Sequence, residues 1–124
     1  MITDELKKKS YELLKQFIEA VNSRDQSILK ERFNINNEIF CEIIENLEEY
    51  FGENFSIEPP PYEGAFEKNA RNEPDISLFE MNEPGNFGIE CAIWMNKKYQ
   101  EPILHAEISK NTGDWEFIYK YIGS

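Results

Sequence analysis

The chain has 124 residues, of which 24 are acidic and 13 are basic, so its formal net charge is −11. A chain of this length supports one hydrophobic core, and 40% hydrophobic with 14% aromatic residues is too apolar for a disordered acidic tail. The negative charge disfavours binding to nucleic acids and to anionic membranes, because both carry phosphate groups. We therefore expect one globular domain over residues 1–124.

No apolar run approaches the ~20 residues that cross a bilayer, and charged residues stand at the start of the chain, where a signal peptide needs apolar ones. The two cysteines, Cys41 and Cys91, lie far apart and outside any metal-binding or redox spacing. These features predict a cytoplasmic protein with free thiols, no metal and no cofactor.

Three helices are expected before residue 52. The first begins at about residue 3, carries apolar residues at helical spacing and ends at the polar residues 22–24. A short second helix follows, with Asp25 as its N-cap. The third spans about Asn37 to Phe51 and ends at Gly52, a residue type that is common just after helices.

After residue 52 the apolar pattern changes from helical spacing to alternation. A short strand is expected at about 55–58, ended by three prolines, and residues 62–74 give no clear pattern. Four longer strands joined by turn-forming residues are expected at about 76–82, 87–95, 103–109 and 115–122. Because their connections are short, neighbouring strands should be antiparallel. This order predicts an α+β fold, with N-terminal helices packed on a curved, mainly antiparallel, cone-like sheet.

Several of these strands are apolar on both faces, which predicts a sheet that is covered on both sides. In the last strand, alternation places one aromatic set on a single face, namely Trp115, Phe117, Tyr119 and Tyr121. The same alternation places Ile118 and Ile122 on the other face.

The end of the first helix and the turn after it, from Leu14 to Asp25, read LKQFIEAVNSRD. This segment resembles the opening of the α+β cone superfamily, which includes nuclear transport factor, ketosteroid isomerase, scytalone dehydratase and the SnoaL-like proteins. The third helix and the late strands fit the same layout. A typical cone, however, has a strand hairpin before its third helix, and here only residues 33–37 are available. The superfamily contains enzymes, ligand binders, adaptors and small bacterial immunity proteins, so the resemblance implies a fold and several possible functions.

The negative charge is concentrated in one stretch. Residues 38–83 contain thirteen acidic and two basic residues, whereas the flanking segments are close to neutral. Four glutamates of the third helix fall at i, i+4, i+7 and i+11, which places them on one stripe, with Glu48 beside it: Glu38, Glu42, Glu45 and Glu49. This helix contains no basic residue, so repulsion between its carboxylates lowers its stability.

An acidic face of this kind is either a solvated surface that promotes solubility or a surface complementary to a basic partner. Glu53 extends the face, and Tyr50 and Tyr62 are candidate aromatic anchors beside it. Basic proteins such as nucleases have positive clefts. We expect a non-enzymatic binding protein, a bacterial immunity protein that occludes the active site of a cognate basic, nuclease-like toxin. A homodimer formed through the sheet is a further alternative.

The main alternative function is a cone-type small-molecule enzyme or ligand carrier. His105 is the only histidine, and alternation places it on the same strand face as Glu107, where the two could act as an acid–base pair in a cavity. Glu90, on the preceding strand, is a third candidate if it points inward. A single His–Glu pair without a further convergent group also fits a structural histidine, so we expect no catalytic site.

Overall fold

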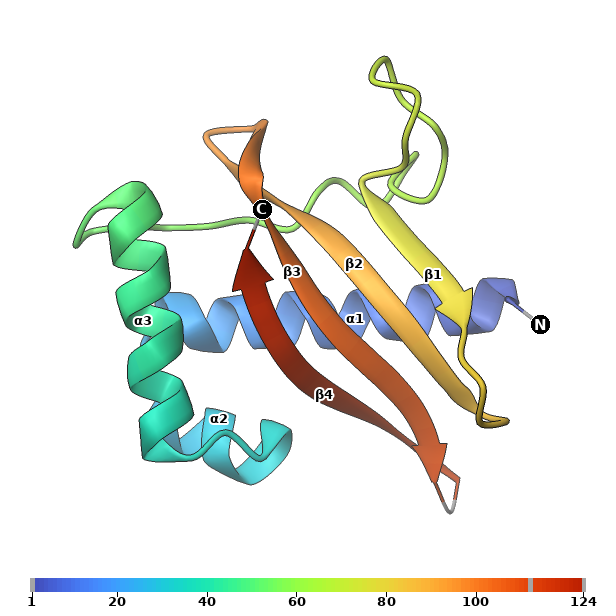
Figure 1. Ribbon diagram of the computed structural model, residues 1–124, viewed down its shortest axis with the longest axis horizontal. Coiled ribbons are helices and arrows are strands. Elements are labelled where there is room, and N and C mark those ends of the chain that lie inside the picture. The colour runs from blue at the N-terminus through green and yellow to red at the C-terminus, as the bar shows by residue number, and fades with distance from the viewer. Residues whose placement is uncertain (1, 112, 124) are drawn as a thin grey trace.

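The computed structural model describes residues 2–111 and 113–123. Three helices come first in the chain, α1 (Asp4–Asn22), α2 (Gln26–Phe33) and α3 (Asn37–Phe51). Four strands follow, β1 (Ile76–Glu80), β2 (Asn86–Met95), β3 (Lys98–Asn111) and β4 (Asp114–Gly123). The strands form one antiparallel sheet in the order β1-β2-β3-β4. Helix α1 crosses one face of the sheet, and α2 and α3 lie on its β4 side (Figure 1). The α+β fold is therefore confirmed.

Side-chain caps fix where the helices begin. Thr3 accepts a hydrogen bond from the backbone N–H of Leu6 at 3.0 Å, which starts α1. Asp25 caps α2 in the same way, as predicted. Asn36 caps α3, and Gly52 follows that helix with a φ of +90°, a conformation that side chains disfavour. The predicted bounds of the third helix are thus confirmed.

The strand expected at about 103–109 is longer in the structure, because β3 already begins at Lys98. Asn96 and Lys97 both have positive φ, 53° and 63°, and form a two-residue hairpin turn. Pro102 lies within β3, close to a shift in its register with β2. A proline has no N–H for the ladder, so it is accommodated where regular pairing is interrupted.

The strand expected at 55–58 is reduced to one β-bridge between Glu58 and Trp94. The three prolines that follow cannot donate ladder hydrogen bonds, so the pairing stops there. The segment is instead attached to α1, because the side chain of Asn22 donates to the carbonyl of Ile57 at 2.7 Å and accepts from its N–H at 2.9 Å. These two hydrogen bonds hold the segment that follows α3 against the end of α1.

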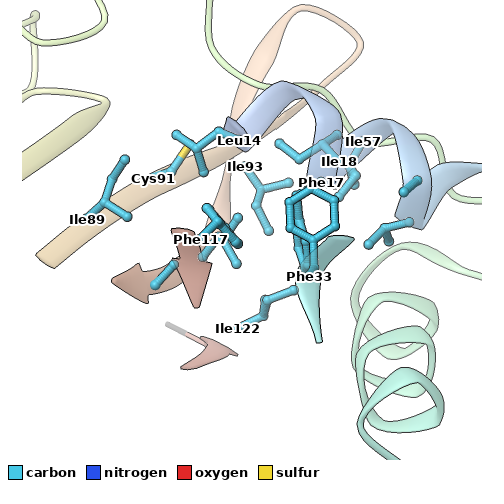
Figure 2. Close-up of a cluster of buried hydrophobic side chains, with 14 of the residues drawn as sticks. Leu14, Phe17, Ile18, Phe33, Ile57, Ile89, Cys91, Ile93, Phe117 and Ile122 are labelled. Atoms are coloured by element: carbon cyan, nitrogen blue, oxygen red, sulfur yellow. The ribbon is translucent and has the colours of Figure 1, made fainter. Parts of the chain in front are cut away.

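The hydrophobic core lies between α1 and the sheet. The ring of Phe17 is at its centre, with its centroid 5.4 Å from that of Phe33 and 5.0 Å from that of Phe117 (Figure 2). Inward-facing residues of α1 and β2 complete this region, including Leu14, Ile18, Ile89, Cys91 and Ile93, each at most 1% exposed. The core thus joins all the layers of the domain.

The prediction that Tyr121 shares a face with Phe117 and Tyr119 is wrong. Tyr119 and Tyr121 pair with adjacent residues of β3, so Lys120 is an extra residue in β4. Such a bulge reverses the alternation of side chains beyond it. Tyr121 is accordingly 52% exposed, whereas Ile122 is buried.

The face of the sheet opposite α1, here called the outer face, was expected to be covered. Among residues 2–111 and 113–123, no helix or strand lies across it (Figure 1). Three aromatic side chains remain exposed on or beside its strands, Phe79, Tyr99 and Tyr121. A homodimer through this face stays a prediction. None of the helices in the described part of the chain is long and apolar enough to span a bilayer.

Candidate functional site

The glutamates of α3 form one continuous exposed surface, here called the acidic stripe: Glu38, Glu42, Glu45 and Glu49. All four are exposed, and Glu48 beside them is partly exposed. The opposite side of the helix is anchored by Ile43 and Leu47, which are both fully buried. The apolar side of the helix packs against the rest of the domain, and this sets the orientation of the helix about its axis. The stripe on the opposite side therefore faces solvent.

The charge of the acidic stripe is not neutralised within the domain. Among residues 2–111 and 113–123, no glutamate of α3 takes part in an ion pair. The last turn of α3 also contains no basic residue, although a helix C-terminus favours cations. Helix α1 also has no base in its last turn, but it does contain an ion pair, in which Nζ of Lys9 lies 3.8 Å from Oε2 of Glu12. The carboxylates of α3 are therefore available to an external cation.

The two tyrosines proposed as anchors lie in different places. Tyr50 is 43% exposed near the end of α3, with its ring 6.0 Å from that of Phe51. Tyr62 is 44% exposed, but its ring packs at 5.1 Å against Tyr11 of α1 and at 6.2 Å against Phe66. Tyr50 thus adjoins the acidic stripe, whereas Tyr62 belongs to an aromatic cluster on α1.

Glu53 is exposed in the turn that follows α3. Its backbone carbonyl accepts a hydrogen bond from the guanidinium of Arg24 at 2.8 Å, and that guanidinium lies 4.3 Å from the ring centroid of Phe55. Arg24 therefore fixes the backbone of the turn and leaves the carboxylate of Glu53 in solvent, next to the end of the acidic stripe.

Helix α3, which carries the acidic stripe, also lies against β4. Burial raises the pKa of Tyr119 on β4 to about 12, and the negative charge of Glu42 adds to this shift. An uncharged phenol is favoured near a carboxylate, which is the physical cause of the smaller contribution. Helix α3 thus borders β4, the edge strand of the sheet.

The candidate residues of the alternative enzyme or carrier site lie on the outer face of the sheet. Nδ1 of His105 lies 3.5 Å from Oε2 of Glu90 on the neighbouring strand, and its ring stacks on Tyr121 with centroids 4.1 Å apart. Glu107 lies farther along β3 and pairs with Lys120 at 3.1 Å. The structure therefore brings His105 and Glu90 together and gives Glu107 a different partner.

A pocket of about 140 Å³ opens beside Glu90, and sequence reasoning did not find it. Arg71 contributes to its wall, with Nη2 2.6 Å from Oδ1 of Asp75 and its guanidinium 3.5 Å from the ring centroid of Tyr99. The lining includes neither His105 nor Glu107. Residues 62–74 gave no periodic pattern, and the only signal was that Arg71 is one of two bases in the acidic segment. The enzyme or carrier alternative stays a prediction.

The cysteines have opposite environments. Cys41 is exposed on α3, and Cys91 is fully buried in β2. Burial raises the pKa of the Cys91 thiol far above its ordinary value, with a smaller contribution from the charge of Asp75. The structure shows no group of three or more potential His, Cys, Asp or Glu ligands for a metal ion among the residues that it describes.

Comparison with models of protein families, with curated proteins and with solved structures found no match to this chain. The acidic stripe is predicted by the sequence pattern, and in the structure its glutamates are exposed and have no ion-pair partner among the described residues.

Proposed function

We propose that this chain is a non-enzymatic binding protein that captures a basic protein partner through the acidic stripe of α3. The observation that carries the proposal is the row of four exposed glutamates that have no ion-pair partner among the described residues. Opposite charge on the two surfaces speeds their encounter and excludes partners of like charge.

The distribution of the charge supports this proposal. A protein that needed acidic residues only for solubility would spread them over its surface and alternate them with bases. Here thirteen acidic residues fall between 38 and 83, and the third helix contains none of the bases that would stabilise it. Because repulsion at helical spacing destabilises a helix, the stripe lowers the folding stability of the domain.

The surroundings of the stripe fit a protein interface. Tyr50 is exposed at its end, and tyrosine is a residue type enriched among energetically important interface residues. Glu53 continues the negative surface beyond the helix. Tyr50 and the stripe thus offer a partner one apolar contact and several polar contacts side by side.

The partner class that fits best is a toxin domain with a positive substrate cleft, such as a nuclease. Such a cleft has to attract phosphates, so it presents the charge that is complementary to the stripe. A helix that covers the cleft would block its substrate, which makes this chain an immunity protein. The resemblance of residues 14–25 to the cone superfamily, which includes immunity proteins, is a second support.

The test uses the reading frame that neighbours the gene for this chain. We expect its product to be a basic protein that arrests growth when expressed alone and that forms a complex with this chain. Coexpression of the chain should restore growth, and the variant E42K/E45K/E49K should fail to do so.

A control variant, E19K/E67K/E101K, makes the same change in net charge at three exposed glutamates outside α3. It should restore growth as the wild type does. Equal rescue by both triple variants, or a neighbouring product that is neither basic nor bound, would overturn the proposal.

A further inference from the structure

A pocket of about 320 Å³ lies between β4 and the α2–α3 connection. Its floor includes the buried side chains of Phe33, Ile35 and Phe117. The helix side is completed by Asn34 and Ile39. Except for Glu116, the lining side chains carry no charge, so the pocket suits an apolar group.

The β4 wall of this pocket consists of four consecutive residues, from Glu116 to Tyr119. Successive side chains of a strand point to opposite faces of the sheet, so a pocket that opened on one face would touch only every second residue. A pocket that touches four in a row runs along the edge of the strand. The backbone N–H and C=O groups of an edge strand point outward at that position.

The edge of β4 is unpaired. This strand is last in the sheet order, and its described residues form no backbone hydrogen bond outside the sheet. Helices α2 and α3 lie on this side of the sheet (Figure 1). An unpaired edge strand can accept a short extended segment as a fifth strand, and the pocket between β4 and the α2–α3 connection would receive one of its side chains.

The charges around the pocket favour a basic segment as the fifth strand. Glu116 lies in the lining itself, and Glu38 and Glu42 flank the lining residue Ile39 in α3. Two bases also adjoin lining residues in sequence, but Arg32 lines a different pocket and Lys120 is paired with Glu107 at 3.1 Å. A second copy of this chain would bring the same carboxylates against its own, which disfavours a homodimer at this edge.

We infer that an extended, basic segment of the partner pairs with the edge of β4, inserts one apolar side chain into the pocket and places lysine or arginine side chains next to Glu116 and the acidic stripe. This inference rests on the proposed function and specifies how the partner binds. The backbone pairing supplies affinity that is independent of sequence, and the pocket and the carboxylates supply the preference for an apolar residue between bases.

The probe is a synthetic seven-residue peptide that alternates lysine with valine or leucine, capped at both ends. Binding is followed through the backbone amide NMR signals of the chain and through amide hydrogen exchange. We expect shifts at residues 33–39 and 115–119. At a peptide concentration about ten times its Kd, the outward-pointing amides of β4 should exchange about tenfold more slowly, because only the free protein exchanges.

Two altered peptides separate the contribution of side-chain charge from that of backbone hydrogen bonding. A version with glutamate in place of lysine should not bind, because it repels the stripe. A version methylated at alternate backbone nitrogens keeps its charge but cannot donate to β4, so it should lose the protection of residues 115–119.

The variant I39W fills the pocket without changing the charge and should abolish the peptide shifts. Its matched control is I28W, the same substitution at an isoleucine of α2 that is 39% exposed and outside the pocket lining. This control should bind the peptide as the wild type does, and thermal unfolding of both variants checks that they are folded.

The outcomes distinguish this inference from the proposed function. If the peptide shifts only the outer residues of α3, and I39W binds it normally, the acidic stripe stands and pairing with β4 is overturned. If no signal shifts at millimolar peptide, pairing is also overturned. If the free chain sediments as a dimer whose β4 amides are already protected, a second copy occupies the edge and the inference is wrong.

Discussion

Replacing Glu49 by lysine should stabilise the protein, although the residue lies in the proposed binding surface. Glu49 is exposed, lies four residues after Glu45 and is two residues from the end of α3 at Phe51. The substitution removes a repulsive i,i+4 pair and creates an attractive one, each worth about 0.2–0.5 kcal/mol. A cation in the last turn also interacts favourably with the helix dipole, by about 0.3–1 kcal/mol.

Together these effects predict that E49K raises the free energy of unfolding by about 1 kcal/mol at low ionic strength. For a domain of this size, the midpoint of thermal unfolding should rise by about 4 °C. Urea denaturation followed by circular dichroism measures the change directly. Because all the groups are exposed, most of the gain should disappear in 0.5 M salt.

The control is E19K, the same change in the last turn of α1. Glu19 lies four residues after Lys15, so the substitution creates a repulsive pair there, which opposes the gain from the helix dipole. We expect almost no change in stability. If E49K is no more stable than the wild type at low salt, or if its gain persists in high salt, the electrostatic account of α3 is refuted.

Three further predictions concern the core and the titrating groups. The variant N22A leaves the N–H and C=O of buried Ile57 without partners and should lower the free energy of unfolding by about 2 kcal/mol in urea. A thiol reagent should modify one cysteine, Cys41, in the native protein and both in urea; rapid native labelling of Cys91 would contradict its burial. The pKa of Tyr119 is raised from 10.0 to about 12, so the unfolded state loses this proton first and the free energy of unfolding should fall as the pH rises from about 10 to about 12. Y119F should remove this part of the pH dependence.

The helices were predictable from sequence because their signals are local. Asp25 caps α2, and α3 has an apolar stripe and a glycine just after its end. Each of these signals acts on residues within a few positions along the chain. The glutamates of α3 follow from the same periodicity, so their exposure required no tertiary information. The proposed binding surface can therefore be predicted from the sequence alone.

The errors arose where pairing between distant segments decides the structure. The bulge at Lys120 depends on how β4 aligns with β3, and it turns Tyr121 outward against the alternation of its own sequence. The single bridge at Glu58 depends on Trp94, and the pocket beside Arg71 depends on Tyr99. None of these contacts leaves a periodic signal in a single sequence.

The most direct test of the acidic stripe as a binding surface is the association rate of this chain with its basic partner, measured by stopped flow between low and high salt. We predict a fast wild-type rate that falls steeply with salt, and a slower E42K/E45K/E49K rate that depends little on salt and approaches the wild-type rate at high ionic strength. Identical rates and salt dependence for the wild type and this variant would contradict capture through α3.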